Sequence, residues 1–332
     1  IRDYYASRGL GDVYKRQIAE AGKRVLDLPM YINVWLGEMY AHIPGTNYPS
    51  GGAVTKTFRF WKHLLKHVDA IAPDIYVSDY REVEELFRTY SGEGNIFHLP
   101  ESSPMPLSMT NSMRAVAEYG LTAVHTFGID ILSAAADRAA LCTMAASGAE
   151  GAKKSALLRE IADSYTILRH SKHLIEKYQG TGRLYAVAQH EGAANQVFDF
   201  GSYIGEIEFL NMESAPINGG NVRRMDNRHM ASSYDGYRAK GFIVDAGNGE
   251  FYLTGDAYKL RLYPKFSLEE LTSAVHAGDF LNTRSQGYLS VTEGEFTADG
   301  EYKVNIIRNG DEYDYGLWVT SDIGVLRVRM DR

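Results

Sequence analysis

The sequence predicts a chain of two unlike halves, an α/β half followed by an all-β half. In residues 18–180, apolar runs typical of buried parallel strands alternate with amphipathic helical patterns. Residues 183–330 instead contain short segments of alternating polarity, separated by turns rich in Gly, Asn and Asp. The chain has 332 residues, which suits two domains of ordinary size.

The first half predicts four β/α units. Its strands are expected over residues 27–36, 68–76, 95–101 and 121–130. Its helices are expected over residues 56–67, 81–90, 112–119 and 153–178. A complete (β/α)₈ barrel needs about 250 residues, and residues 18–180 are too few for one. The pattern therefore predicts half of a barrel or a small open parallel sheet.

The second half predicts an antiparallel β-sandwich or jelly roll, because its apolar positions alternate over short segments. The expected strand segments are 183–192, 196–201, 203–210, 240–247, 249–256, 258–264, 287–296, 301–310 and 324–330. Residues 211–237 are polar and without pattern, which indicates a long loop. We thus expect a partial barrel domain over residues 18–180 and a β-sandwich accessory domain over residues 181–332.

The first seventeen residues are expected to be foreign to the protein. Their sequence continues into no helical or strand pattern and contains no signal-peptide core. It resembles the translation of sequencing-adaptor read-through, which often heads metagenomic gene fragments. Residues 1–17 are therefore left out of the fold prediction, with a genuine, poorly ordered N-terminus as the alternative.

Composition excludes several classes of function. The net charge is −7 and there is no basic run, which argues against nucleic acid and against an anionic membrane surface as partners. No apolar run is long enough to span a membrane. Cys142 is the single cysteine, so an internal disulfide and a multi-cysteine metal site are excluded. His63 and His67 have helical metal-ligand spacing but lack a third ligand, so we predict neither a metal nor a cofactor.

Polar and aromatic side chains lie where the four predicted parallel strands end. In chain order they are Asn33, Trp35, Asp74, Tyr76, Glu101, Phe127 and Asp130. In β/α barrels the active site forms at this edge, and a glycosidase needs carboxylates for the anomeric centre and aromatic faces for the sugar. Glu101 is the most informative, since it follows an otherwise apolar strand. These residues could equally be the polar positions at which any buried strand meets solvent.

Several segments in the same order resemble glycoside hydrolase family 35, the β-galactosidase-like enzymes. The segments of the first half are LPMYINVWL, YPSGGAV, WKHLLKHVDAIAPDIY, NIFHLPES and GLTAVHTFGID. The tail is similar to the β domain of unassigned function that follows the barrel in a bacterial subgroup, in KGFIVDAGNGEFYLTGD, LSVTEGEFTADGEYKVNIIRNGDE and GVLRVRM. The resemblance covers roughly residues 18–332.

The resemblance implies roles for the strand-end residues. The four predicted strands correspond to the fifth to eighth strands of the barrel, and Glu101 corresponds to the catalytic nucleophile. Tyr76 is the candidate for the tyrosine that supports this nucleophile. The residues implied to line the sugar pocket are Asn33, Trp35, Tyr48, Asp74, Phe127 and Asp130. The resemblance also implies a carbohydrate partner, a β-galactoside or related oligosaccharide, and a periplasmic or extracellular location.

One element of the family pattern is missing. The general acid/base of the family is a Glu that follows Asn at the end of the fourth strand, and no acid in this sequence stands in that context. Retaining hydrolysis by double displacement needs two carboxylates. We therefore expect a fragment of a retaining exo-glycosidase, by family a β-galactosidase, that is inactive by itself. The alternative is a non-catalytic carbohydrate-binding or structural scaffold protein.

Overall fold

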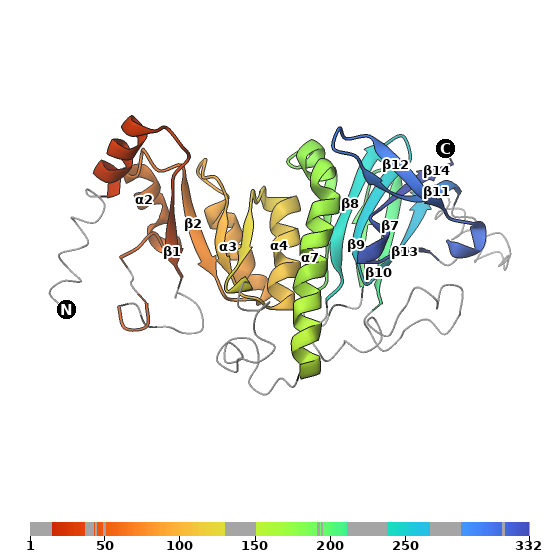
Figure 1. Cartoon of the computed structure of the whole chain (residues 1–332), viewed down its shortest axis with the longest axis horizontal. Helices are drawn as coiled ribbons and strands as arrows, with labels where there is room; N and C mark the ends of the chain where they lie inside the picture. The colour runs from red at the N-terminus through yellow and green to blue at the C-terminus, as the bar shows by residue number, and fades with distance from the viewer. Residues whose placement is uncertain are drawn as a thin grey trace. The chain divides into compact units, whose positions relative to one another are not determined.

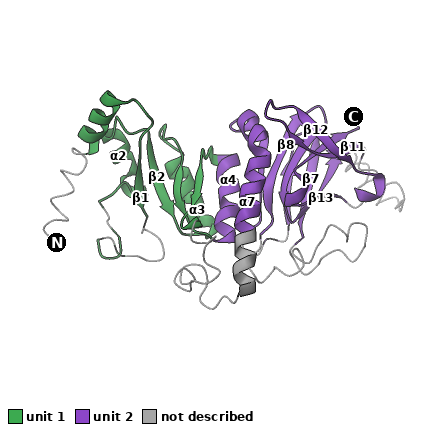
Figure 2. Cartoon of the chain, viewed as in Figure 1, with its two compact units in different colours: residues 1–104, 119–131 green, residues 105–118, 132–332 purple. Residues whose placement is uncertain are grey.

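A computed structural model describes most of the chain. It covers residues 15–36, 43, 45–48, 51–129, 151–190, 193, 195–210, 238–265, 287–313 and 316–331, with the backbone only for residues 151–159. Two compact units are distinguished, and each is described by itself (Figure 2). Unit 1 comprises Ile1–Pro104 and Tyr119–Ile131, and unit 2 comprises Met105–Glu118 and Leu132–Arg332.

Unit 1 contains a parallel sheet of four strands, as predicted. The strands are β1 (Tyr31–Trp35), β2 (Ala70–Ile75), β3 (Leu99–Ser102) and β4 (Val124–Thr126). They lie in the order β1-β2-β3-β4, and every neighbouring pair is parallel (Figure 1). Chain order and spatial order agree because each strand is followed by a crossover that returns the chain beside it.

The strands are shorter than the apolar runs predicted. The third strand was expected from residue 95, but it begins at Leu99. The Asn95 side chain takes the place of a strand backbone here. Its Oδ1 accepts from the Ile71 amide at 2.8 Å and its Nδ2 donates to the Ile71 carbonyl at 3.0 Å. The buried Asn95 amide thus satisfies the backbone hydrogen-bonding groups of Ile71 in β2, at a chain position that precedes β3. The apolar pattern of the sequence could not indicate this.

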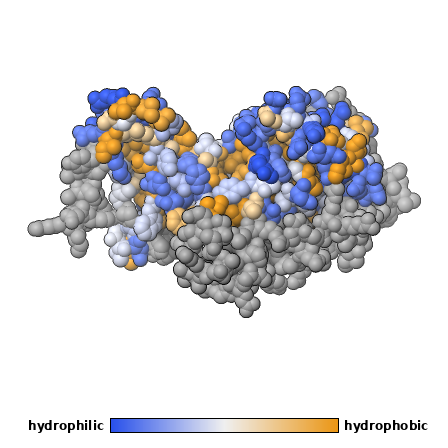
Figure 3. Space-filling view, in the orientation of Figure 1, coloured by the Kyte–Doolittle hydropathy of each residue, from blue (hydrophilic) through white to orange (hydrophobic). Residues whose placement is uncertain are grey.

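Helices of unit 1 accompany the parallel strands. A helix over residues 15–25 precedes β1, and η1 (Thr55–Thr57) runs into α2 (Phe58–Leu64) before β2. Helix α3 (Tyr80–Tyr90) starts at Asp79, whose carboxylate accepts from the Arg81 and Glu82 amides. This is the N-cap arrangement expected of Asp, and the apolar side of α3 is buried. Hydrophobic side chains also reach the surface of the described chain (Figure 3). Leu26, which follows the first helix, is 62% exposed and Phe60 of α2 is 60% exposed.

Unit 2 contains two antiparallel sheets. The four-stranded sheet has the order β13-β10-β7-β6 and the six-stranded sheet the order β12-β11-β14-β9-β8-β5. The strands are β5 (Leu184–Ala188), β6 (Asn195–Asp199), β7 (Tyr203–Phe209), β8 (Lys240–Gly247), β9 (Glu250–Asp256), β10 (Tyr258–Pro264), β11 (Tyr288–Phe296), β12 (Tyr302–Ile307), β13 (Leu317–Val319) and β14 (Val325–Met330). Apolar side chains from both sheets share one buried cluster, which includes Ile207, Ile243 and Leu260.

The nine predicted strand segments of the second half are all strands, and a tenth was missed. Strand β13 has three residues, which are too few to show an alternating pattern. The predicted loop over residues 211–237 lies outside the described residues.

The α-helices α4 and α7 are described in unit 2. Helix α4 (Pro106–Tyr119) was predicted to begin at residue 112, but it begins at Pro106, because proline is well suited to the first helical turn. Helix α7 (Gly151–Tyr178) lies beside β8 and β9 (Figure 1). The Ser171 and Thr254 hydroxyls are 2.6 Å apart across this contact. The structure therefore groups α7 with the β-rich unit, whereas the sequence analysis assigned it to residues 18–180. Among the described helices, none is both long enough and apolar enough to cross a membrane.

Candidate functional site

The carboxyl ends of the parallel strands bring three predicted site residues into one row. Trp35 of β1 is the register partner of Asp74 of β2, and Asp74 is the register partner of Glu101 of β3. Direct register partners on one face have their β-carbons about 5 Å apart. The two carboxylates are therefore neighbours across the sheet, with an indole ring at the end of the row.

Tyr76 and Glu101 are joined by a hydrogen bond. The Tyr76 hydroxyl donates to Oε2 of Glu101 at 2.6 Å, which is the contact expected from the sequence. Partial burial and the neighbouring Glu101 carboxylate both raise the pKa of the Tyr76 phenol above its usual value of 10. The phenol therefore stays protonated at every physiological pH and serves as a fixed donor. It orients one oxygen of Glu101 and leaves the other available for chemistry.

A bulge in β3 aims Glu101 at this site. Leu99 pairs with Val124 and Ser102 with Thr126, so β3 uses three residues where β4 uses two. His98, which directly precedes β3, lies on the site's face of the sheet, because its ring is tilted against the ring of Tyr31 of β1 with the centroids 4.8 Å apart. Three positions further along a regular strand, a side chain would point to the opposite face. The extra residue in β3 turns the Glu101 side chain back to the face on which His98 lies. Bulges near active sites often redirect a side chain in this way.

Asp74 is the most perturbed acid of the site. Burial, and after it the Glu101 charge, raise the pKa of its carboxyl from 3.8 to about 7, against the opposing effect of a hydrogen bond from Asn33. The Asn33 amide nitrogen lies 3.1 Å from Oδ1 of Asp74. Near neutral pH, Asp74 is therefore poised between its neutral and ionised forms. Such shifted acids gather at functional sites more often than elsewhere.

We expect Asp74→Asn to stabilise the protein more at alkaline than at acidic pH. With its pKa raised in the folded state, Asp74 favours folding below pH 3.8, and this contribution is lost as the pH rises through about 7. Asparagine removes the penalty and can still accept from Asn33. Because the group is about half exposed to water, we discount the full shift and expect a gain of about 1–2 kcal/mol near pH 8. Urea unfolding of both proteins at about pH 4 and pH 8 measures this, and an equal gain at both values would contradict it.

The aromatic residues predicted for the sugar pocket are exposed near the carboxylates. Trp35 is 65% exposed and Phe127 is 43% exposed. The Phe127 ring meets the Tyr76 ring edge-on, with centroids 6.0 Å apart. The Phe127 amide also donates to the carbonyl of Ser102, which fixes the end of β4 beside β3. Both rings can therefore present an apolar face to a ligand at this edge.

Tyr48 and Asp130 complete the set of residues predicted for the pocket. Tyr48 is a buried residue of the turn at residues 45–48, and its role as a sugar ligand stays a prediction. Asp130 lies outside the described residues. The structure thus brings together Asn33, Trp35, Asp74, Tyr76, Glu101 and Phe127.

Sequence reasoning missed a second row of rings deeper on the same face. His98 contacts Tyr31 at a centroid distance of 4.8 Å and His125 at 5.2 Å. Burial first, and then the charge of His125, lower the pKa of His98 below 6.5, so its imidazole is neutral at pH 7. The sequence contained a signal for this row, because His98 and His125 interrupt two predicted strands that are otherwise largely apolar. This row forms the floor below the carboxylates.

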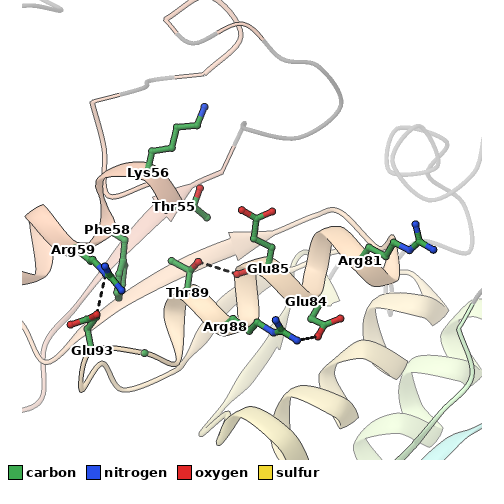
Figure 4. Close-up of a pocket in the computed structure, with 11 residues that line it drawn as sticks. Thr55, Lys56, Phe58, Arg59, Arg81, Glu84, Glu85, Arg88, Thr89 and Glu93 are labelled. Atoms are coloured by element: carbon green, nitrogen blue, oxygen red, sulfur yellow. Dashed lines mark hydrogen bonds and ion pairs between the residues drawn. The ribbon is translucent and has the colours of Figure 1, made fainter.

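A pocket elsewhere on unit 1 contains none of the predicted residues. It has a volume of about 600 Å³ and lies between η1, the start of α2 and the exposed side of α3 (Figure 4). Its walls are charged, and opposite charges are paired across it, as in the 3.0 Å contact between Arg59 and Glu93. Paired surface charges of this kind are common on solvated helices. We therefore place the candidate site at the strand ends and not in this pocket.

A family model matches part of the chain. The family described as "Domain of unknown function (DUF5597)" matches residues 161–320. No curated protein matches the chain. The matched region begins within α7 and runs through the two antiparallel sheets, so it falls in unit 2. The β-rich half is therefore similar to a domain family of unknown function. Its identity with the β domain that follows the barrel in the family 35 subgroup, and membership of glycoside hydrolase family 35, stay predictions.

Proposed function

We propose that unit 1 carries the nucleophile side of a retaining glycosidase site that acts on terminal β-galactosides. In this proposal the four parallel strands are half of a (β/α)₈ barrel, with β1 and β4 at the ends of the described sheet. The observation that carries it is the hydrogen bond between the Tyr76 hydroxyl and Glu101, set at the carboxyl ends of the strands. In β/α barrels this is the edge at which catalytic residues gather.

Glu101 is the proposed nucleophile. Tyr76 holds its Oε2, so the remaining carboxylate oxygen attacks the anomeric carbon and expels the leaving group, forming a glycosyl ester. Water then cleaves this ester and restores the carboxylate. A positioned donor lowers the entropic cost of attack because the carboxylate already has one orientation before the sugar arrives.

Asp74 is proposed to bind the sugar. With a pKa of about 7, its carboxyl can donate to a sugar hydroxyl when neutral or accept from one when ionised. Asn33 fixes the orientation of Asp74 through its 3.1 Å contact. Trp35 and Phe127 supply exposed aromatic faces for the apolar side of the sugar ring.

The proposal gives this chain only one of the two carboxylates that double displacement needs. A natural galactoside has a sugar or alkyl leaving group, which departs slowly unless a general acid protonates it. A dinitrophenolate leaving group needs no proton. We therefore expect no measurable turnover of a natural β-galactoside by this chain, together with slow attack on activated substrates.

Covalent trapping tests the proposal directly. The probe is 2,4-dinitrophenyl 2-deoxy-2-fluoro-β-galactoside, whose fluorine slows breakdown of the glycosyl ester. We expect intact-protein mass spectrometry to show one added sugar, and peptide mapping to place it on Glu101. Glu85→Gln, an exchange on the exposed side of α3, is the matched control and should be labelled like the parent. A label on another carboxylate would reassign the nucleophile, and no label would favour a non-catalytic binding protein.

We expect Tyr76→Phe to slow the trapping reaction by roughly 10- to 100-fold. The exchange keeps the ring against Phe127 but removes the hydrogen bond to Glu101. Hydrogen bonds to charged groups contribute about 1.5–3 kcal/mol, which corresponds to this range of rates. The rate should be measured against probe concentration, since a positioning role lowers the limiting rate while half-saturation changes little. An unchanged limiting rate would show that Tyr76 does not position the nucleophile.

A further inference from the structure

Unit 2 contains a cavity that no part of the proposed catalytic site uses. It has a volume of about 330 Å³, within the range of small-ligand pockets. It lies between the last turns of α7 and the ends of β9 and β11. Its walls include His173, Glu176, Lys177, Tyr178, Tyr252 and Phe296, and Gly300 of the turn after β11 borders it.

The walls of this cavity are aromatic. The Phe296 ring lies 5.6 Å from Tyr252 and 5.9 Å from His173, measured between centroids, and is tilted against both. Tyr178 is almost fully buried, with the Lys177 ammonium 5.1 Å from its ring centroid. Three elements far apart in the sequence thus contribute rings to one concave surface.

The Tyr252 ring is held in place from behind. Its hydroxyl donates to Oε1 of Glu250 at 2.6 Å, and Oε2 of Glu250 accepts a hydrogen bond from the Arg327 guanidinium at 2.8 Å. The guanidinium of Arg327 lies 5.9 Å from the Tyr252 ring centroid. The wall is therefore rigid before any ligand arrives, which lowers the cost of binding.

The rim of the cavity offers both hydrogen-bond acceptors and donors. Glu176 and Lys177 are adjacent and exposed, and the Lys172 ammonium lies 3.6 Å from Oε1 of Glu176. His173 lies beside them, with Nδ1 3.6 Å from Oε2 of Glu176. Gly300 adds no side chain, and its φ of +81° disfavours any other residue. The opening therefore stays wide, and acceptors and donors lie side by side on its rim.

We propose that this cavity binds one neutral sugar unit of an oligosaccharide. A pyranose has an apolar face of C–H groups, which matches the aromatic wall, and a rim of hydroxyls, which matches Glu176 and Lys177. A purely apolar ligand would cover the two charged groups without hydrogen-bonding them, at a cost in desolvation. The site is separate from Glu101, so it binds sugar without cleaving it.

Saturation-transfer NMR on the full chain tests this proposal. The probes are β-1,4-galactotetraose, cellotetraose and inorganic phosphate, with displacement titrations giving the affinity. The parent protein should give signals from at least one tetrasaccharide. Glu176→Gln and Phe296→Ala should weaken that binding by about 10-fold or more, since each removes about one hydrogen bond to a charged group or one ring contact.

Matched variants separate this site from the catalytic one and from loss of folding. Phe296→Tyr keeps the ring, and Lys303→Met changes an exposed residue of β12 outside the cavity, so both should bind like the parent. Glu101→Gln should also bind equally, which would uphold this site even if the catalytic proposal failed. Thermal unfolding checks Phe296→Ala, and the exposed Glu176→Gln remains informative if that variant unfolds. The proposal is overturned if neither tetrasaccharide gives a signal, if phosphate alone binds, or if Glu176→Gln and a folded Phe296→Ala bind like the parent.

Discussion

Glu101→Gln is expected to abolish the release of dinitrophenolate from 2,4-dinitrophenyl β-galactoside. Glutamine keeps the shape of the side chain and can still accept from the Tyr76 hydroxyl, but it has no anionic oxygen to attack the anomeric carbon. Loss of a catalytic nucleophile typically costs about 10⁴- to 10⁶-fold in rate. Because the activated leaving group needs no general acid, the assay isolates the nucleophile step. Initial rates at saturating substrate, read by absorbance, give the measurement.

Two comparisons make this result interpretable. Glu85→Gln removes a carboxylate from the exposed side of α3 in the same unit and should leave the rate unchanged. Sodium azide added to a Glu101→Gly variant can enter the space left by the side chain and attack in place of the carboxylate, giving the galactosyl azide of inverted configuration. An intact rate in Glu101→Gln would show that Glu101 is not the nucleophile, and Asp74 would then be the next carboxylate to test.

Lys240→Met is expected to destabilise the protein by about 3–5 kcal/mol. The Lys240 ammonium pairs with Glu160, and the two side chains are 0% and 1% exposed. Removing the lysine leaves a buried carboxylate without its counter-charge, which is the costly way to break such a pair. Oε2 of Glu160 already has no hydrogen-bond partner among the described residues. Chemical denaturation followed by circular dichroism measures the free energy of unfolding.

A double variant separates the pair's own contribution from the cost of the orphaned charge. Lys240→Met combined with Glu160→Leu removes both charges, and we expect it to recover most of the lost stability. Lys259→Met is the matched control, because Lys259 is also buried but its partner Glu208 is 31% exposed and can be rehydrated. That variant should lose much less. If Lys240→Met and Lys259→Met lowered the free energy of unfolding equally, burial of the partner carboxylate would not determine the loss of stability.

The pH behaviour of the site follows from the same electrostatic reasoning. Asp74 and Glu101 are register partners, so ionising both places two like charges side by side. Burial also disfavours the ionised form of Asp74. In the sequence, Asp74 and Glu101 are two acids far apart along the chain. Neither their register pairing nor its effect on the pKa of Asp74 could therefore be predicted from the sequence.

The sequence by itself determined the order and type of most elements. Apolar runs such as the one around β2 predict parallel strands because both faces of such a strand are buried. Alternating segments such as β9 and β10 predict antiparallel strands because one face differs from the other. Glu101 stood out for the same local reason, as an acid ending an apolar run. Element ends were less well predicted, as at Asn95, where a side chain replaces a strand backbone.

Tertiary structure alone decided which side chains meet. The bulge in β3 sets the face on which Glu101 lies, and a bulge depends on pairing with a neighbouring strand, which no local pattern reports. The contact of Tyr76 with Glu101 and the ring wall of Phe296 and Tyr252 likewise join residues from separate strands. The burial of Lys240 against Glu160 depends on α7 packing on the six-stranded sheet. The local sequence determines how each segment folds. Register and packing determine the distances between segments and the burial of their side chains. Distance and burial in turn determine the charge and orientation of the groups that could act on a sugar.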